Sequence, residues 1–222
     1  DVFLASKTHD RTRDGSLRLL DDSLKRLRTD RLDLWQLHDL RTKADLDAVF
    51  GPDGALEALL QARADGRVRF LGITGHYDPE ILVEAMRRFE FDAALIALNA
   101  ADVHRLSFLQ TAAAEAANRE MGVIAMKVYS QGALLHRGRL GESLQGSGLT
   151  PDEALGYCLS QPQVSLAIIG CSTPAEVDDN VRIAREFAPL DESILRELEN
   201  RTAANAAQYT AYKRLPFAPM EL

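Results

Sequence analysis

The heptapeptide Leu-Asp-Leu-Trp-Gln-Leu-His at residues 32–38 is the stretch that decides the fold. Its alternating pattern predicts a buried strand that ends on a polar residue, with Gln36 and His38 on one face and Trp35 and Leu37 on the other. Two interpretations of His38 are open. It is either hydrogen-bonded to a neighbouring loop, or a ligand or general acid–base group at the rim of a β/α barrel, where active sites lie.

A second stretch, Val-Phe-Leu-Ala-Ser-Lys-Thr at residues 2–8, has the same design. This predicted strand ends on Lys7, and lysine is rarely buried without a partner. A second strand that ends on a basic group favours the functional interpretation of His38. We therefore expect Lys7 and His38 side by side at the C-terminal ends of adjacent parallel strands.

The composition is that of an ordinary globular protein, with 46% apolar and 27% charged residues among 222. We expect one domain over residues 1–222, with a C-terminal tail at 208–222. The net charge of −7 leaves no basic stripe for phosphates, so nucleic acid is not an expected partner. Cys158 and Cys171 are too few for a disulfide framework and indicate a reducing, cytoplasmic compartment.

The sequence carries no membrane or export signal. No apolar run is long enough to span a bilayer, and no signal peptide is visible, so no membrane association is expected. The chain has no initial Met and opens inside a predicted strand. We expect it to have been cut from a longer one.

Strands and helices alternate along the chain. Strands are predicted over residues 2–8, 32–38, 70–74, 93–99, 122–127 and 164–169. Helices are predicted over residues 16–28, 55–64, 78–89, 107–120, 174–187 and 191–207, with a further helix that begins at Thr150. Ser16 is the expected N-cap of the first helix, and residues 38–54 and 130–148 are expected to be loops.

Single helices between strands imply right-handed β-α-β units and a parallel sheet, either doubly wound or closed into a β/α barrel. No Gly-x-Gly-x-x-Gly follows the first strand, which removes the strongest signal for a Rossmann domain. The strands end on Lys7, His38, Thr74, Asn99, Lys127 and Gly170. Six such ends that converge favour the mouth of a barrel.

Five segments of the chain resemble, in the same order, the aldo-keto reductase family. They are residues 6–8, 23–38, 66–74, 122–127 and 170–180. Segment 66–74, Gly-Arg-Val-Arg-Phe-Leu-Gly-Ile-Thr, matches the family pattern Gly-Lys-Val-Arg-x-Ile-Gly-x-Ser. The resemblance runs from residue 2 to about residue 188. It implies an α/β fold, a (β/α)8 TIM barrel of which about six β/α units are present in this chain.

The resemblance implies a catalytic group of Asp, Tyr, Lys and His around a nicotinamide. In that family the Tyr protonates the carbonyl oxygen, the Lys lowers the pKa of the Tyr, the Asp pairs with the Lys, and the His orients the carbonyl. Lys7 and His38 match the last two members. The Asp and Tyr belong to a unit that we expect to precede Asp1 in the parent chain.

The resemblance also implies a nicotinamide dinucleotide cofactor and no metal. The positions that match its binding residues are Thr74, Asn99, Lys127, Gly170, Ser172, Asp179 and Asn180. Gly75 and Leu95 depart from the family's Asn and Gln. Met126 stands where an aromatic ring often stacks on the nicotinamide, and it either takes that place or fills the core.

The glycine-containing turn at residues 170–173 opens a helix, where free N–H groups and the helix dipole favour phosphate, although an ordinary helix cap is the alternative. Glu176 falls where many relatives place Arg or Gln near the 2′-phosphate, and a carboxylate would repel that phosphate. The expected cofactor is therefore NADP or NAD, with the family favouring NADP and Glu176 arguing against it.

Three functions are consistent with these features. The first is reduction of an aldehyde or ketone to an alcohol, with this chain as a fragment of an NAD(P)H-dependent oxidoreductase that acts on a small-molecule carbonyl substrate. The second is a non-catalytic, nucleotide-binding regulatory subunit. The third is an inactive truncated product. The sequence names neither the substrate nor the oligomeric state.

Overall fold

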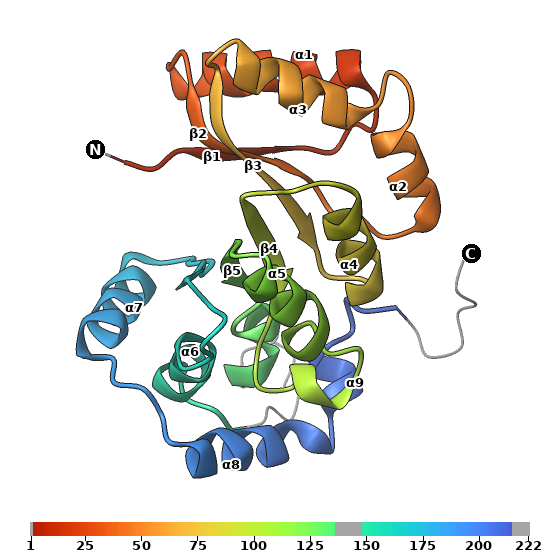
Figure 1. Cartoon of the computed structure of the whole chain (residues 1–222). Coiled ribbons are helices and arrows are strands. Elements are labelled where there is room, and N and C mark those ends of the chain that lie inside the picture. The colour runs from red at the N-terminus through yellow and green to blue at the C-terminus, as the bar shows by residue number, and fades with distance from the viewer. Residues whose placement is uncertain (1, 136–147, 215–222) are drawn as a thin grey trace.

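The computed structural model describes residues 2–135 and 148–214, which form a six-stranded parallel sheet flanked by helices (Figure 1). The order of the strands in the sheet follows their order in the chain. The strands are β1 (Ala5–Thr8), β2 (Leu32–Leu37), β3 (Val68–Gly75), β4 (Ala93–Ala97), β5 (Gly122–Met126) and β6 (Leu166–Ala167). Each arises from one of the six predicted strands. Residues 136–147 of the expected loop and 215–222 of the expected tail lie outside the described residues.

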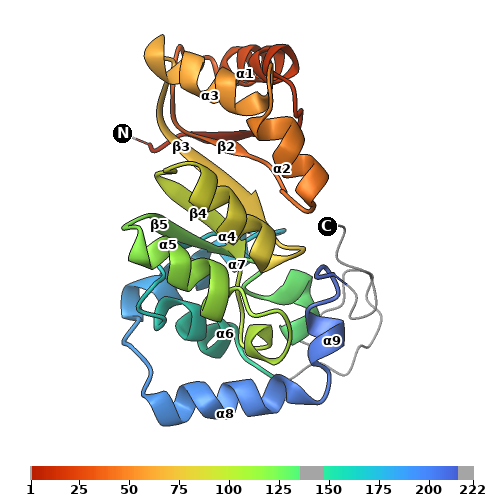
Figure 2. The same cartoon turned by 45° about the vertical axis from the view of Figure 1, so that its right-hand side comes forward.

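In Figure 2 helices lie above the first strands, in front of the middle strands and below the last strands. They are α1 (Arg13–Leu27), α2 (Lys43–Phe50), α3 (Ala55–Ala64), α4 (Pro79–Arg88), α5 (Ala114–Asn118), α6 (Pro151–Leu159), α7 (Pro174–Glu186), α8 (Glu192–Ala203) and α9 (Ala206–Tyr209). The 3-10 and π-helical turns are η1 (Asp102–His104), η2 (Leu109–Ala113) and η3 (Ser130–Leu135). Among the helices within the described ranges, none combines the length and apolar character that crossing a membrane requires.

The first helix begins four residues earlier than expected, because Thr12 and not Ser16 is its N-cap. The Thr12 hydroxyl accepts a hydrogen bond from the N–H of Gly15 at 3.2 Å, which satisfies one of the free donors of the first turn. Ser16 is buried inside the helix, and its hydroxyl bonds the Thr8 hydroxyl at 2.9 Å. The serine thus ties α1 to the end of β1.

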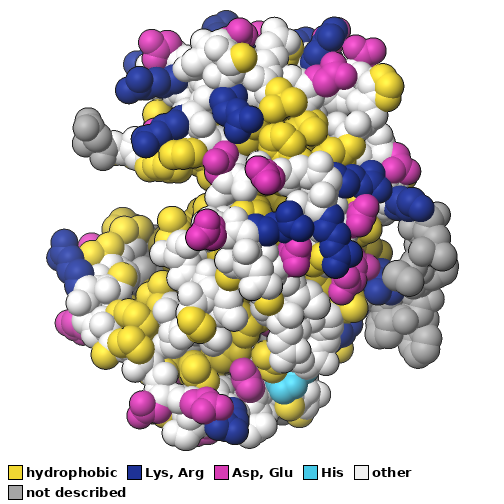
Figure 3. Space-filling model, viewed as in Figure 1, with side chains coloured by type: hydrophobic (Ala, Val, Ile, Leu, Met, Phe, Trp, Pro, Cys, Tyr) yellow, Lys and Arg dark blue, Asp and Glu magenta, His cyan; other side chains and the backbone are white. Residues whose placement is uncertain are grey.

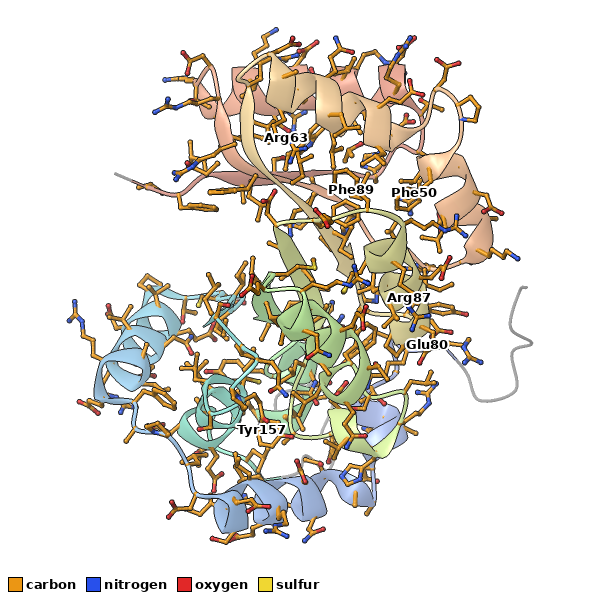
Figure 4. The ribbon with its side chains drawn as sticks, in the orientation of Figure 1. Phe50, Arg63, Glu80, Arg87, Phe89 and Tyr157 are labelled. Atoms are coloured by element: carbon orange, nitrogen blue, oxygen red, sulfur yellow. The ribbon has the colours of Figure 1, made fainter. Side chains whose placement is uncertain are left out.

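A helix that the sequence did not predict, α2, lies inside the expected loop at residues 38–54. Thr42 and Asp45 form a capping box, each side chain accepting from the backbone N–H of the other residue. Phe50 at its end lies near Phe89 at the end of α4, and both pack against Phe91 (Figure 4). With eight residues the helix is too short to show a clear apolar period.

The two outermost strands are shorter than expected. The sequence predicts strands over residues 2–8 and 164–169, whereas β1 and β6 contain only four and two residues. Among the described residues, each of these strands has a partner on one side only. One-sided pairing leaves fewer ladder hydrogen bonds to hold the flanking residues in an extended conformation.

Two predicted helices are broken. The segment predicted as one helix over residues 107–120 begins with the π-helical turn η2 and continues as α5. The Asp102 carboxylate accepts from the N–H groups of Phe108 and Leu109 at 3.1 and 2.9 Å. The segment 191–207 divides into α8 and α9 at Asn205.

The sheet buries side chains on both faces. On the outer face, Trp35 and Leu37 belong to the large core shared with the helices. On the inner face, Leu34, Leu95 and Ile124 form a smaller cluster together with other strand residues. The alternation predicted for residues 32–38 therefore separates an inner from an outer face.

Exposed apolar side chains gather at the two edges of the sheet. Phe3, next to β1, is 59% exposed, and Ile168, next to β6, is 50% exposed. Val177 and Val181 of α7 are exposed on the β6 side. Figure 3 shows a notch on the left of the molecule, between the part that carries β1 and the part that carries α7, with apolar side chains along it. The inner face of the sheet opens toward this notch.

Candidate active site

Lys7 and His38 lie side by side at the C-terminal ends of β1 and β2. Lys7 is paired in register with Gln36, and the N–H of His38 donates to the carbonyl of Thr8 at 2.8 Å. Both side chains are exposed. The register places Lys7 and Gln36 on the same face of the sheet as Leu34, which is the inner face. The structure thus brings together the two residues that the sequence singled out.

Arg11 fixes the backbone that follows β2. Its guanidinium donates to the carbonyl oxygens of His38 and Asp39 at 2.8 and 2.9 Å, and its Nε donates to the Asp45 carboxylate at 2.8 Å. Asp39 has a φ of 54°, a left-handed conformation that is uncommon for a residue other than glycine. The three hydrogen bonds from Arg11 therefore hold this turn, and with it the position of His38.

Thr74 lies one residue before the end of β3, and its buried side chain contacts the turn after β2. Its hydroxyl accepts from the N–H of Asp39 at 2.8 Å, and its side chain is not exposed. A Cβ at the next residue, Gly75, would lie 2.9 Å from Cδ2 of Leu82. A side chain at residue 75, where the resemblance expects Asn, would therefore require the Leu82 side chain of α4 to shift.

His76 is a member of this site that the sequence reasoning missed. Its Nε2 lies 3.4 Å from Oδ1 of Asp39, whose Oδ2 accepts from Nε of Arg41 at 2.7 Å. Burial lowers the pKa of His76, Asp39 opposes this effect, and the cations of Lys127 and Arg41 add to it. The signal that could have found His76 is its place directly after the strand end at Gly75.

Partial loss of hydration around its ring lowers the pKa of His38, although the residue as a whole is exposed. Asp39 opposes this shift, while the Lys7 ammonium, His76 and Arg11 add to it. Because the pKa falls below the usual 6.5, the imidazole is mainly neutral at pH 7. A neutral imidazole can donate one hydrogen bond to a carbonyl oxygen.

Replacing Lys7 with methionine should raise the pKa of His38, because removal of a nearby positive charge favours the protonated imidazole. An NMR titration of the histidine ring protons measures the shift. Lys25→Met, on the exposed side of α1, is the matched control and should leave the His38 titration unchanged. An equal His38 midpoint in both variants would show that the Lys7 ammonium does not act on this ring.

Asn99 follows β4 and is fully buried. Its Oδ1 accepts from the N–H of Ala101 at 2.9 Å, while its Nδ2 donates to the carbonyl of Lys127 and to the hydroxyl of Tyr212, both at 3.0 Å. Both amide hydrogens are therefore used within the protein. The structure brings Asn99 to the strand ends as expected, but with its donors occupied by groups that the sequence did not reveal.

The segment at residues 170–180 leads into α7 after β6. Thr173 caps the helix by accepting from the N–H of Glu176 at 3.3 Å, and the Glu176 carboxylate accepts from the N–H of Ser172 at 2.6 Å. The Glu176 carboxylate thus occupies the anion position that the turn offers. A Cβ at Gly170 would meet no atom within 4 Å, which leaves open space beside this turn.

The remaining predicted cofactor residues are distributed around this turn. Asp179 is exposed, and the Asn180 amide donates to the carbonyl of Glu176 at 2.7 Å and accepts from the hydroxyl of Tyr129. Tyr129 follows β5, so this bond joins α7 to the strand ends. Lys127, between β5 and Tyr129, has a φ of 60° and is half-buried.

Comparison with known proteins gives one consistent result. The sequence model of the Aldo/keto reductase family matches residues 1–153. A D-threo-aldose 1-dehydrogenase from Pseudomonas sp is 27% identical over 202 residues, which cover 79% of this chain and 58% of that protein. An uncharacterized oxidoreductase, YqkF, from Bacillus subtilis (strain 168) is 23% identical and covers 91% of this chain and 74% of its own length.

The fold has solved counterparts. The holo form of the aldo-keto reductase AKR11C1 from Bacillus halodurans superimposes with a TM-score of 0.70 at 23% identity, over 90% of this chain and 72% of that one. The present chain spans 58% of the length of the aldose dehydrogenase. The six parallel strands are accordingly part of a (β/α)8 barrel. The family match and the shared fold together show that this chain belongs to the aldo/keto reductase family of oxidoreductases.

Proposed function

We propose that the chain serves in the NAD(P)H-dependent reduction of an aldehyde or ketone to an alcohol, as part of a longer enzyme. The observation that carries the proposal is the placement of Lys7 beside His38 on adjacent strand ends at the inner face of the sheet. Active sites of β/α barrels lie at this end of the strands. The substrate is proposed to be a small-molecule carbonyl compound, and the 222 residues are proposed to form one domain.

In this proposal His38 donates a hydrogen bond from its neutral imidazole to the carbonyl oxygen of the substrate and so orients it. Lys7 supplies the positive charge that lowers the pKa of a proton-donating hydroxyl. Three tyrosines of the chain have their hydroxyls engaged elsewhere, Tyr129 with Asn180, Tyr157 with Glu199 and Tyr212 with Asn99. The resemblance implies that the donor is a tyrosine of the unit before β1, and we propose that it precedes residue 1 in the parent chain.

The bound nicotinamide cofactor would supply the hydride. We propose that the turn at Gly170 and Ser172, with Asp179 and Asn180 on α7, holds its adenosine half, and the open space at Gly170 supports this. Thr74, Asn99 and Lys127 are proposed for the nicotinamide half. The turn has open space at Gly170, but its Ser172 N–H is already bonded to the Glu176 carboxylate. The fit is poor at Asn99, whose two amide hydrogens are already used. The Glu176 carboxylate at this turn favours NAD over NADP.

Replacing Asp179 and Asn180 together with alanine should abolish nucleotide binding, which we expect to be weak for the unaltered chain. Calorimetric titration with NAD(H) and NADP(H) measures both. Glu197→Ala with Asn200→Ala, on an exposed face of α8, is the matched control and should bind as the unaltered chain does. Sub-micromolar binding that survives the Asp179 and Asn180 changes would place the site elsewhere.

A second candidate is a nucleotide-binding regulatory subunit without catalytic activity. The engagement of Asn99 favours it, because both of its amide hydrogens are already used within the protein at the strand ends. The two functions differ in one measurement. A regulatory subunit binds nucleotide without oxidising it in the presence of a reactive aldehyde, even when joined to the segment that precedes it.

A further inference from the structure

The last described residues cross the C-terminal ends of the strands. We call residues 205–214 the strap. The N–H of Arg214 donates to the carbonyl of Tyr77 at 2.8 Å, and its Nε donates to Asp78 at 2.7 Å, just after β3. The hydroxyl of Ser130, after β5, donates to the carbonyl of Tyr209. The strap is thus held at Tyr209 and at Arg214, beside the strand ends.

Between these two points the strap is anchored by a buried ion pair. Lys213 and Asp102 form a salt bridge with neither side chain exposed. The Lys213 ammonium also donates to the carbonyl of Arg105 at 2.7 Å. A lysine charge is removed from water only where such partners are fixed in place. The buried ion pair therefore holds the strap in one position beside the strand ends.

Tyr212 is the strap residue that reaches into the site. Its hydroxyl oxygen accepts from Nδ2 of Asn99 at 3.0 Å. Its ring packs edge-on against the ring of His76, with centroids 5.9 Å apart. The remaining hydrogen of the Asn99 amide goes to the carbonyl of Lys127. A ligand acceptor can bind this amide only if it replaces Tyr212 or Lys127, and the second partner is backbone.

We propose that Tyr212 and the carboxamide oxygen of a nicotinamide nucleotide compete for the same N–H of Asn99, so that nucleotide binding unseats Tyr212. This inference rests on the proposed function, which assigns Asn99 to the nicotinamide half. A carboxamide oxygen and a phenol oxygen are both neutral acceptors, so one can substitute for the other at this N–H. The free energy needed to break the hydrogen bond between Asn99 and Tyr212 is subtracted from the binding free energy of the nucleotide, which lowers its apparent affinity.

Tyr212→Phe tests the competition while it keeps the ring against His76. The variant leaves the Asn99 N–H without its acceptor in the free protein, so NADH should bind roughly two- to tenfold more tightly, as measured by NADH fluorescence. Tyr157→Phe is the matched control. It also removes a tyrosine hydroxyl bond, to Glu199 at 2.7 Å, but between α6 and α8, away from the strand ends (Figure 4). Its affinity should equal that of the unaltered chain.

Hydrogen exchange provides a readout that does not depend on turnover. The amide hydrogens of Thr210 and Lys213 donate hydrogen bonds within the strap. Saturating NADH should accelerate their exchange in the unaltered chain, because loss of the Tyr212 bond to Asn99 removes one of the contacts that hold the strap. If NADH binds but Tyr212→Phe binds equally or more weakly, or the strap becomes protected, the competition is wrong and the proposed function stands. If NADH binds to neither the unaltered chain nor Tyr212→Phe, the proposed function fails and the competition fails with it.

Discussion

Replacing Asp102 with asparagine should lower the free energy of unfolding by about 3–5 kcal/mol, because it leaves the Lys213 charge buried without a counter-ion. Asp102 also accepts from the hydroxyl of Ser107 at 2.8 Å and from the N–H groups of Phe108 and Leu109. Asparagine has one acceptor oxygen and two donor hydrogens. Its NH₂ group would therefore face donors that the Asp102 carboxylate now accepts. Urea unfolding followed by circular dichroism measures the loss.

A surface pair gives the matched control for this prediction. Asp152 bonds Arg182 with both side chains about half exposed, so Asp152→Asn should cost no more than about 1 kcal/mol. The double variant Asp102→Asn with Lys213→Met should lose less than the sum of the two single changes, since it leaves no unpaired charge. A loss for Asp102→Asn as small as that for Asp152→Asn would contradict the view that this ion pair anchors the strap.

Turnover of 4-nitrobenzaldehyde by the 222-residue chain should be roughly 10²–10⁴-fold slower than by a chain that also carries the proposed Asp and Tyr, because general acid catalysis contributes a factor of this size. Within the described residues, Lys7 forms no ion pair with a carboxylate. Oxidation of NAD(P)H in the presence of the aldehyde measures the rate in both chains.

Two substitutions determine whether any residual rate belongs to this site. Turnover by the 222-residue chain that disappears on Lys7→Met or on His38→Ala would mean that another residue supplies the proton, and the proposed role of a preceding tyrosine would be wrong. Residual turnover that neither substitution changes would be a background reaction outside the strand ends. Lys25→Met serves again as the control for loss of a lysine.

Alternation and helix periodicity were sufficient to predict the sheet. The strand at residues 32–38 was recognisable because its two faces differ, with Leu34 toward the inner cluster and Trp35 toward the outer core. The sequence was a poor guide to the start of α1. Ser16 has the chemistry of a cap but is held inside the helix by the Thr8 hydroxyl, a contact from a residue eight positions away. Helix α2 was missed because eight residues give too short a pattern.

Site residues at the ends of predicted strands could be identified from the sequence. Contacts between residues far apart in the sequence could not. Lys7 and His38 were found from the pattern of their own strands. The engagement of Asn99 by Tyr212 joins residues 113 positions apart, and no local pattern reports such a contact. The Asp39–His76 contact was missed for a related reason, because it requires the left-handed turn that Arg11 holds after β2.

The sequential order of the strands has a consequence for how the chain folds during synthesis. Each strand pairs only with its neighbours in the chain, so the sheet can be assembled from its N-terminal end as the strands emerge from the ribosome. The strap cannot take part until the end, because Lys213 follows its partner Asp102 by 111 residues. The six strands can therefore pair before Tyr212 reaches the Asn99 amide.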